Sequence, residues 1–264
     1  MAQQPHATTT LRRFLTQNKP FTTCSARSQQ HPTNTKWPTF EDPVTIWDAF
    51  TLGNLDRQFG ALLDIPIPSD RLPIAVEAPE DLPITNSKSI GHLVARNDAM
   101  MQASLNVAKS HLQLFPGIVL RFRYNDVDQT QLPKLFDGRK TLRPDHIIQL
   151  DRFPASILVV GLARPSSHWS ARRAVSSLGD LDKGGLQPLR ELANLCKIAG
   201  TEFGYIQTDE DMVVCRFTLA SGNKWKASIK PIPWSTYETS NLTADLALWW
   251  LCMRAMSMLG NQQG

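Results

Sequence analysis

Two neighbouring segments hold the residues best suited to chemistry. Arg143-Pro144-Asp145-His146 opens one expected strand, and the next expected strand ends at Arg164. Carboxylates on adjacent strands can hold Mg²⁺, which neutralises phosphate and activates water. A basic side chain two residues beyond such an acid shares its strand face, because side chains alternate along a strand. Asp145 is therefore a candidate metal ligand and catalytic residue of a phosphodiester site, and Arg164 is a candidate catalytic residue on the next strand.

Five pieces of the chain, in order, resemble the PD-(D/E)XK-type domains that are abundant in filamentous fungi. The resemblance covers roughly residues 88 to 259 and implies a restriction-endonuclease-like fold, a mixed sheet flanked by helices with an αβββαβ core. In that family the motif strand reads Gly-Glu-x-Lys-Pro-Ser and is followed by a Trp. The pieces are Arg143-Pro144-Asp145, VVGLARPSSHW (159–169), AGTEFGYIQTDEDMVVCRF (199–217), Ile232-Pro233-Trp234 and LTADLALWWLCM (242–253).

The motif strand departs from that pattern at both functional positions. Leu162 stands where the resemblance places the glutamate, and Arg164 stands where it places the lysine. Leucine cannot ligate Mg²⁺, and arginine holds a phosphate without a lysine's reactivity. No acid occurs between Val159 and Arg164. The departures predict lost activity, unless Asp98 on the preceding helix supplies the missing carboxylate.

Each candidate also has a structural interpretation. Asp145 can be a strand-edge carboxylate held by backbone N–H groups or by Arg143, and Arg164 can be a structural arginine. Arg143 and the pair Arg172-Arg173, beside His168 and Trp169, are candidate contacts to a nucleic-acid backbone. The pair fits a solvated loop equally well. The acidic turn at 209–211 lacks the twelve-residue calcium pattern, which favours an exposed hairpin turn.

Three functions are consistent with these residues. The first is a catalytically impaired nuclease-like domain that binds nucleic acid or a protein partner. The second is an active nuclease, for which Mg²⁺ would be the cofactor and Asp98 the migrated ligand. The third is a protein-interaction module that docks through the tryptophan-rich C-terminal helix around Trp249 and Trp250. Oligomeric state is open in all three.

Hydrophobic periodicity predicts an α/β fold. Helices are expected over 86–115, 186–199 and 242–259, and a broken helical stretch over 44–63. Strands are expected over 117–124, 146–150, 157–163, 203–208, 212–219 and 225–232. The run ILVVGLA at 157–163 has no polar alternation, which is typical of a strand covered on both faces. The last strands and the last helix extend the implied core.

Composition divides the chain into an arm and one domain. Residues 1–42 have few apolar residues and precede almost all of the acidic ones, which predicts a disordered basic arm. A mitochondrial transit peptide is the alternative, because such peptides are also rich in Arg and Ser and poor in acids. Residues 43–264 are expected to form a single domain, of which 43–85 is a helical N-terminal extension.

Charge and cysteine usage bound the remaining expectations. The formal net charge is +4 and the sequence pI is about 8.9, which permits a nucleic-acid partner without requiring one. The four cysteines form no CxxC pair, which favours free thiols in a reducing compartment, the nucleus or the cytoplasm. No stretch is long and apolar enough for a membrane span.

Overall fold

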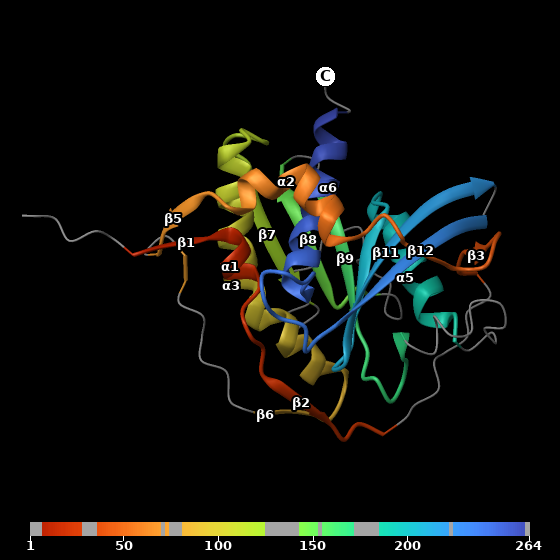
Figure 1. Cartoon of the computed structure of the whole chain (residues 1–264). Helices are drawn as coiled ribbons and strands as arrows, with labels where there is room; N and C mark the ends of the chain where they lie inside the picture. The colour runs from red at the N-terminus through yellow and green to blue at the C-terminus, as the bar shows by residue number, and fades with distance from the viewer. Residues whose placement is uncertain are drawn as a thin grey trace, which may run out of the picture.

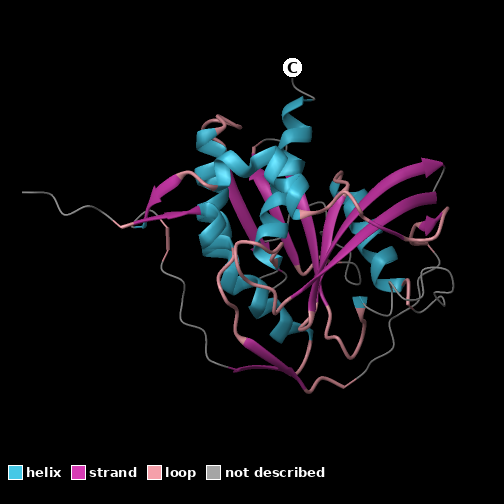
Figure 2. Cartoon of the chain, viewed as in Figure 1, coloured by secondary structure: helices cyan, strands magenta, loops and turns pink. Residues whose placement is uncertain are grey.

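A mixed sheet flanked by helices is the centre of the fold. The computed structural model describes residues 7–27, 36–69, 72–73, 81–124, 143–152, 155–171, 185–221 and 224–261. These residues form an eight-stranded sheet in the order β3-β12-β11-β10-β9-β8-β7, with β4 also beside β12. Figures 1 and 2 show the twisted sheet with helices packed against it. The α/β class expected from the periodicity is confirmed.

The sheet combines antiparallel and parallel pairs. Its strands are β3 (Thr39–Phe40), β4 (Thr45–Ile46), β7 (Val119–Tyr124), β8 (His146–Asp151), β9 (Ser156–Ala163), β10 (Phe203–Gln207), β11 (Asp211–Ser221) and β12 (Lys224–Pro233). Strand β10 runs parallel to β9, β3 and β4 run parallel to β12, and the other pairs are antiparallel. Every residue of β9 after Ser156 is buried, as expected for a strand covered on both faces.

The two faces of the sheet are covered by different helices. On one face α3 (Ser87–His111) and α6 (Ala244–Asn261) pack over residues such as Ile148 and Val214, and α2 (Leu52–Leu63) joins their cluster. On the other face α5 (Gln187–Ala199) packs over residues such as Val160 and Leu162. Side chains of a given strand therefore alternate between two separate cores.

Helix α6 belongs to the interior, so its two tryptophans do not form the docking surface that the interaction-module interpretation expects. Trp249 and Trp250 are both 0% exposed. Phe50 stacks on Trp250 at 4.1 Å, and Phe59 meets Trp249 edge-on at 5.7 Å. A helix that is apolar around most of its circumference is buried on most sides, and α6 offers no tryptophan surface to a partner.

The N-terminal segment is folded in its described part, in contrast to the disordered arm expected over 1–42. It contains β1 (Thr8–Thr10), α1 (Leu11–Leu15) and β2 (Phe21–Cys24). Strand β1 pairs with β5 (Pro66–Pro68), and β2 pairs with β6 (Asp81–Ile84). Leu11, Phe14 and Leu15 are almost completely buried in the core that contains α3 and α6. The short helix α1 anchors this mostly polar segment, because three of its five side chains reach the core.

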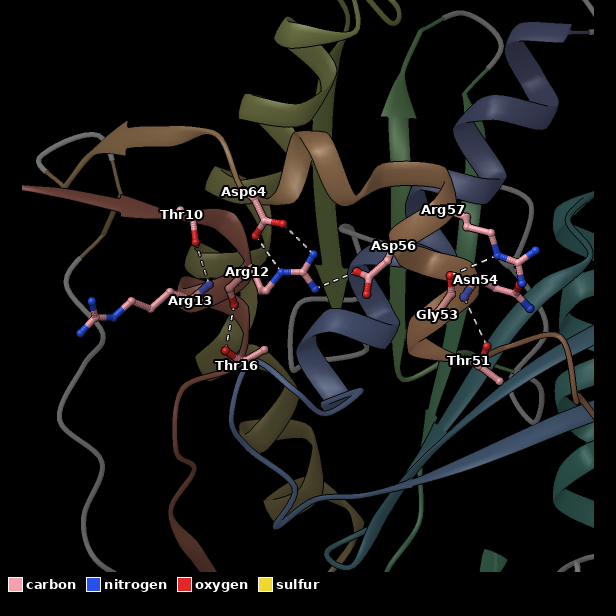
Figure 3. A network of polar contacts seen from close by, with 10 residues as sticks. All are labelled: Thr10, Arg12, Arg13, Thr16, Thr51, Gly53, Asn54, Asp56, Arg57 and Asp64. Carbon is pink, nitrogen blue, oxygen red and sulfur yellow. Dashed lines mark hydrogen bonds and ion pairs between the residues drawn. The ribbon is translucent and has the colours of Figure 1, made fainter.

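Arg12 fixes α1 against α2, as Figure 3 shows. Its Nε and Nη2 donate to the two carboxylate oxygens of Asp64 at 2.7 and 2.9 Å, and its Nη1 lies 2.8 Å from Asp56. The hydrogen bonds to Asp64 raise the pKa of the guanidinium above its usual range and lower the pKa of that carboxyl. The planar fork suits this bidentate contact, so Arg12 orients the helix more specifically than a lysine would.

The same segment is joined to the beginning of α6. The Leu15 carbonyl accepts a hydrogen bond from the Thr243 hydroxyl at 2.7 Å. Lys19 forms a buried ion pair with Asp245, and its ammonium lies 4.4 Å from the centre of the Trp234 ring. These two buried polar contacts join residues that are far apart in sequence. Among the described residues, no helix combines the length and the apolarity needed to cross a membrane.

Candidate functional site

The predicted strand motifs meet at one edge of the sheet. Strands β9 and β10 are parallel, so their carboxyl ends lie together, and the antiparallel strand β8 begins at the same edge. The Asp145 amide donates to the Gly161 carbonyl at 3.0 Å, and the Arg164 amide donates to the Gln207 carbonyl at 2.9 Å. Carboxyl ends of parallel strands are a common place for a site in α/β folds. Asp145 and Arg164 are brought together there, as the spacing predicts.

Arg164 bridges two carboxylates at this edge. Its Nη1 donates to Asp145 Oδ2 at 2.9 Å, and its Nη2 donates to Glu191 Oε2 at 2.8 Å. Asp145 Oδ2 also accepts the Ala163 amide at 2.9 Å. Burial alone would lower the pKa of Arg164, but the two carboxylates outweigh it and raise that pKa. The positive charge of this arginine is therefore balanced within the protein.

The remaining motif position is apolar and buried. Leu162 is 1% exposed and packs in the core on the α5 face, two residues before Arg164 on the same face. It pairs with Ile206 on β10. With a leucine here and a guanidinium between Asp145 and Glu191, these residues do not fit a magnesium ion, which prefers several oxygen ligands. No group of three or more metal-binding side chains occurs among the described residues.

Asp98 is not brought together with Asp145. It lies on α3 and approaches His146, with 3.5 Å between Oδ1 and Nε2. The neighbouring residues Asp145 and His146 point to opposite faces of the sheet, and His146 contacts Tyr124 and Tyr205 on the face that α3 covers. Burial raises the pKa of Asp98, although His146 opposes this effect. The structure therefore gives no support to Asp98 as the migrated metal ligand.

The basic candidates are only partly described. Arg143 is partly buried, two residues before Asp145. Arg172 and Arg173 lie outside the described residues. His168 Nε2 lies 2.6 Å from the Arg27 carbonyl, and the buried Trp169 donates from Nε1 to the Gly185 carbonyl at 3.0 Å. The described part of the loop that follows β9 is therefore held by contacts within the protein.

Two acidic residues at this edge were missed by sequence reasoning. Glu191 lies inside an amphipathic helix, and only tertiary packing turns it toward Arg164. Asp209 was expected in an exposed turn but is 5% exposed. It accepts hydrogen bonds from the Ser166 amide at 2.7 Å and the Ser166 hydroxyl at 2.6 Å, because the ends of β9 and β10 are adjacent. The adjacency of parallel strands was the only available signal.

Gly161 makes room for a buried contact across the sheet. It pairs with Tyr205 on one side and with His146 on the other. The Tyr205 hydroxyl reaches across it to His146 Nδ1. A Cβ atom at Gly161 would lie 2.4 Å from the Tyr205 ring, closer than carbon atoms can approach. The small residue next to the motif leucine is required by this packing.

Replacing Gly161 with alanine is expected to lower the free energy of unfolding by about 1–3 kcal/mol through overpacking. Gly91→Ala is the matched control, since no atom lies within 4 Å of a Cβ there, and it should stabilise α3 by about 0.5–1 kcal/mol. Urea unfolding of both variants measures the effects. If Gly161→Ala matched Gly91→Ala, the packing of Tyr205 over Gly161 would be incorrect.

A surface hollow lies away from the sheet edge that carries Asp145 and Arg164. It has a volume of about 280 Å³ and is lined by apolar side chains such as Phe217, Trp225 and Met258, near the carboxyl ends of α5 and α6. Its lining does not include Asp145, Arg164, Glu191 or Asp209. Its position gives no reason to move the candidate site.

Comparison with known proteins gives no match. No protein-family model, no curated protein and no solved structure is significantly similar to this chain. Functional interpretation therefore depends on the geometry of the chain itself.

Proposed function

We propose that this protein is a catalytically impaired nuclease-like domain that binds nucleic acid without cutting it. Support for the fold comes from the element order α3, β7, β8, β9, α5, β10, which is the αβββαβ order that the resemblance implies. The parallel pairing of β10 with β9 agrees with it. Fold alone does not define function, so the argument must come from the site.

One observation carries the proposal, the position of the Arg164 guanidinium between Asp145 and Glu191. A nuclease of this type would need the Asp145 carboxylate, and a second carboxylate at the position of Leu162, to hold a divalent cation. Here the guanidinium supplies the balancing positive charge itself. The cluster thus keeps the shape of a cation site while removing its capacity to activate water.

Binding is the activity that remains for such a domain. The net charge of +4 favours an acidic partner, and nucleic acid is the acidic polymer for which the resembling fold is built. The buried state of Trp249 and Trp250 removes the specific feature that favoured a protein partner. We therefore assign nucleic acid as the partner.

The test is a combined cleavage and binding assay on the full-length chain. Single- and double-stranded DNA and RNA are incubated with Mg²⁺ or Mn²⁺, beside an Asp145→Ala control. We expect no metal-dependent cleavage, together with binding that weakens as salt increases. Cleavage that disappears in Asp145→Ala would overturn the claim of impairment, and absence of binding to every nucleic acid would overturn the claim of a nucleic-acid partner.

A further inference from the structure

The register of the β11–β12 hairpin places several polar side chains on one face. Arg216 pairs with Ser228, Thr218 with Lys226, and Val214 with Lys230. Cross-strand partners share a face, and residues two apart along a strand do so too. Val214 belongs to the core under α6, so this face is the one that α6 covers at its inner end. Lys230, opposite the buried Val214, is half-buried at this inner end, and farther out the face carries Arg216, Lys226 and Ser228.

That outer part of the face is open to solvent, whereas its reverse side is core. Lys226 has a side chain 58% exposed and Arg216 one 37% exposed. On the reverse side Phe217, Ala227 and Ile229 are almost completely buried in the core under α5. The apolar face of this strand pair packs in the core, so only the basic face is left to solvent. The basic side is the one presented to a partner.

Arg254 extends the same surface from α6. Its guanidinium lies 5.4 Å from the Trp47 ring and 5.8 Å from the Trp250 ring. Burial, and after it the charge of Arg216, lower the pKa of Arg254, whereas Glu202 opposes them. Its Nε is buried without a hydrogen-bond partner, and no carboxylate within the described ranges pairs with it. The two aromatic rings hold the guanidinium in place beside a second cation, Arg216.

The acids near this surface do not neutralise it. Glu202 Oε2 lies 3.0 Å from Arg216 Nε, and Asp42 Oδ2 lies 3.2 Å from Lys226 Nζ. Lys230 and Arg254 form no ion pair with any residue that the structure describes. The Thr45 hydroxyl donates to the Ala227 carbonyl at 3.4 Å, and the Ser228 hydroxyl, 3.0 Å from that of Thr45, can donate to a phosphate oxygen. Cations and hydroxyl donors thus alternate along an extended ribbon.

We propose that this basic face, formed by Arg216, Lys226, Ser228, Lys230 and Arg254, binds the sugar-phosphate backbone of a nucleic acid. The inference rests on the proposed function and goes beyond it by placing the contact on the hairpin, away from the Asp145 edge. An extended ribbon of cations and hydroxyl groups suits a polymer with a regular charge along its length.

The test measures the affinity of the full-length protein for a fluorescent single-stranded oligonucleotide at several salt concentrations. Lys226→Gln/Lys230→Gln removes two charges from the basic face, and Arg13→Gln/Lys88→Gln removes two from exposed positions on α1 and α3. We expect the first pair to weaken binding at least tenfold at low salt. Loss of two phosphate contacts should also lower the slope of log affinity against log salt by about 1.4. The control pair should change neither quantity.

Each outcome decides one point. Equal binding by both double variants, with intact binding by the unmodified protein, would overturn the basic face and leave the proposed function standing. No binding by the unmodified protein would overturn the proposed function and this inference with it. Displacement of the oligonucleotide by polyglutamate at the same charge concentration would show a general anion surface and would also overturn the assignment. Arg254→Gln, tested last, should weaken binding in the same direction as the lysine pair.

Discussion

Replacing Arg164 with methionine is expected to lower the free energy of unfolding by about 3 kcal/mol and to make it sensitive to divalent cations. Removing one partner of a partly buried ion pair leaves an uncompensated charge, which is the costly outcome. In this variant Asp145 and Glu191 would repel each other across the space that the guanidinium fills in the unmodified protein. A divalent cation could then take that place, since it is attracted by both carboxylates.

The measurement is urea unfolding of Arg164→Met with and without Mg²⁺ or Ca²⁺. Stability should increase with the logarithm of metal concentration, as it does for any ligand that binds only the folded state. Arg190→Met is the matched control, because Arg190 donates to the carbonyls of Trp37 and Pro38. It should lose stability without gaining a response to metal.

A second variant separates charge from packing. In Arg164→Met/Asp145→Asn/Glu191→Gln both carboxylates are neutral, so much of the lost stability should return and the metal effect should vanish. A metal response that persisted in the triple variant would show that the cation binds elsewhere. The absence of any metal response in Arg164→Met would contradict the view that its guanidinium occupies the place of a cation.

Deletion of residues 1–27 is expected to abolish cooperative folding of the remaining chain. Leu11, Phe14 and Leu15 are at most 3% exposed. Each contributes about 1.5–3 kcal/mol through burial, or roughly 5–9 kcal/mol together. Whole domains are stable by only about 5–15 kcal/mol, so this loss is comparable with the total. The deletion also removes Lys19, the partner of Asp245.

Circular dichroism during thermal unfolding of the deleted chain provides the check. Because a deletion can fail for trivial reasons, Leu15→Ala provides a graded version and should cost about 2–5 kcal/mol. Phe21→Ala is its control, since Phe21 is 70% exposed and its loss should cost less than about 0.5 kcal/mol. A deleted chain with an unchanged unfolding midpoint would restore the view of the N-terminal segment as a separate arm.

The elements after residue 86 could be predicted because their local pattern agrees with their environment. The apolar run at 157–163 has no polar alternation, and β9 is indeed covered by helices on both faces. The periodic stretch before Gly200 becomes α5, and Gly200 itself adopts a left-handed conformation at φ 70°. In these segments the signal lies within ten to twenty residues, which is the range that periodicity reports.

The N-terminal segment could not be predicted because composition averages over its length. Polar residues outnumber apolar ones there, yet Leu11, Phe14 and Leu15 all turn inward from one short helix. The helix is held by Arg12, whose partners Asp56 and Asp64 are more than forty residues away. Its order thus depends on tertiary contacts that no local window contains.

Part of the candidate site could be predicted because it depends on the local period of a strand. The period of a strand places Leu162 and Arg164 on one face, and the strand order brings Asp145 beside them. The contribution of Glu191 depends on how α5 rotates over the sheet, which the sequence does not specify locally. Asp98 was proposed from its position on the helix alone, and helix spacing does not say which side of a sheet the helix will cover; in the structure it approaches His146.

The junction between the N-terminal segment and α6 also affects how the chain is made. The Lys19–Asp245 pair spans 226 residues of sequence, and the Thr243–Leu15 bond spans 228. Contacts of such separation form late and slow folding, because a long loop must close before they stabilise anything. On the ribosome, Leu11 to Lys19 emerge early and must wait until the residues of α6 have been synthesised and released from the exit tunnel. During that interval their apolar side chains lack the partners that bury them in the folded protein, and such exposed apolar surface favours aggregation.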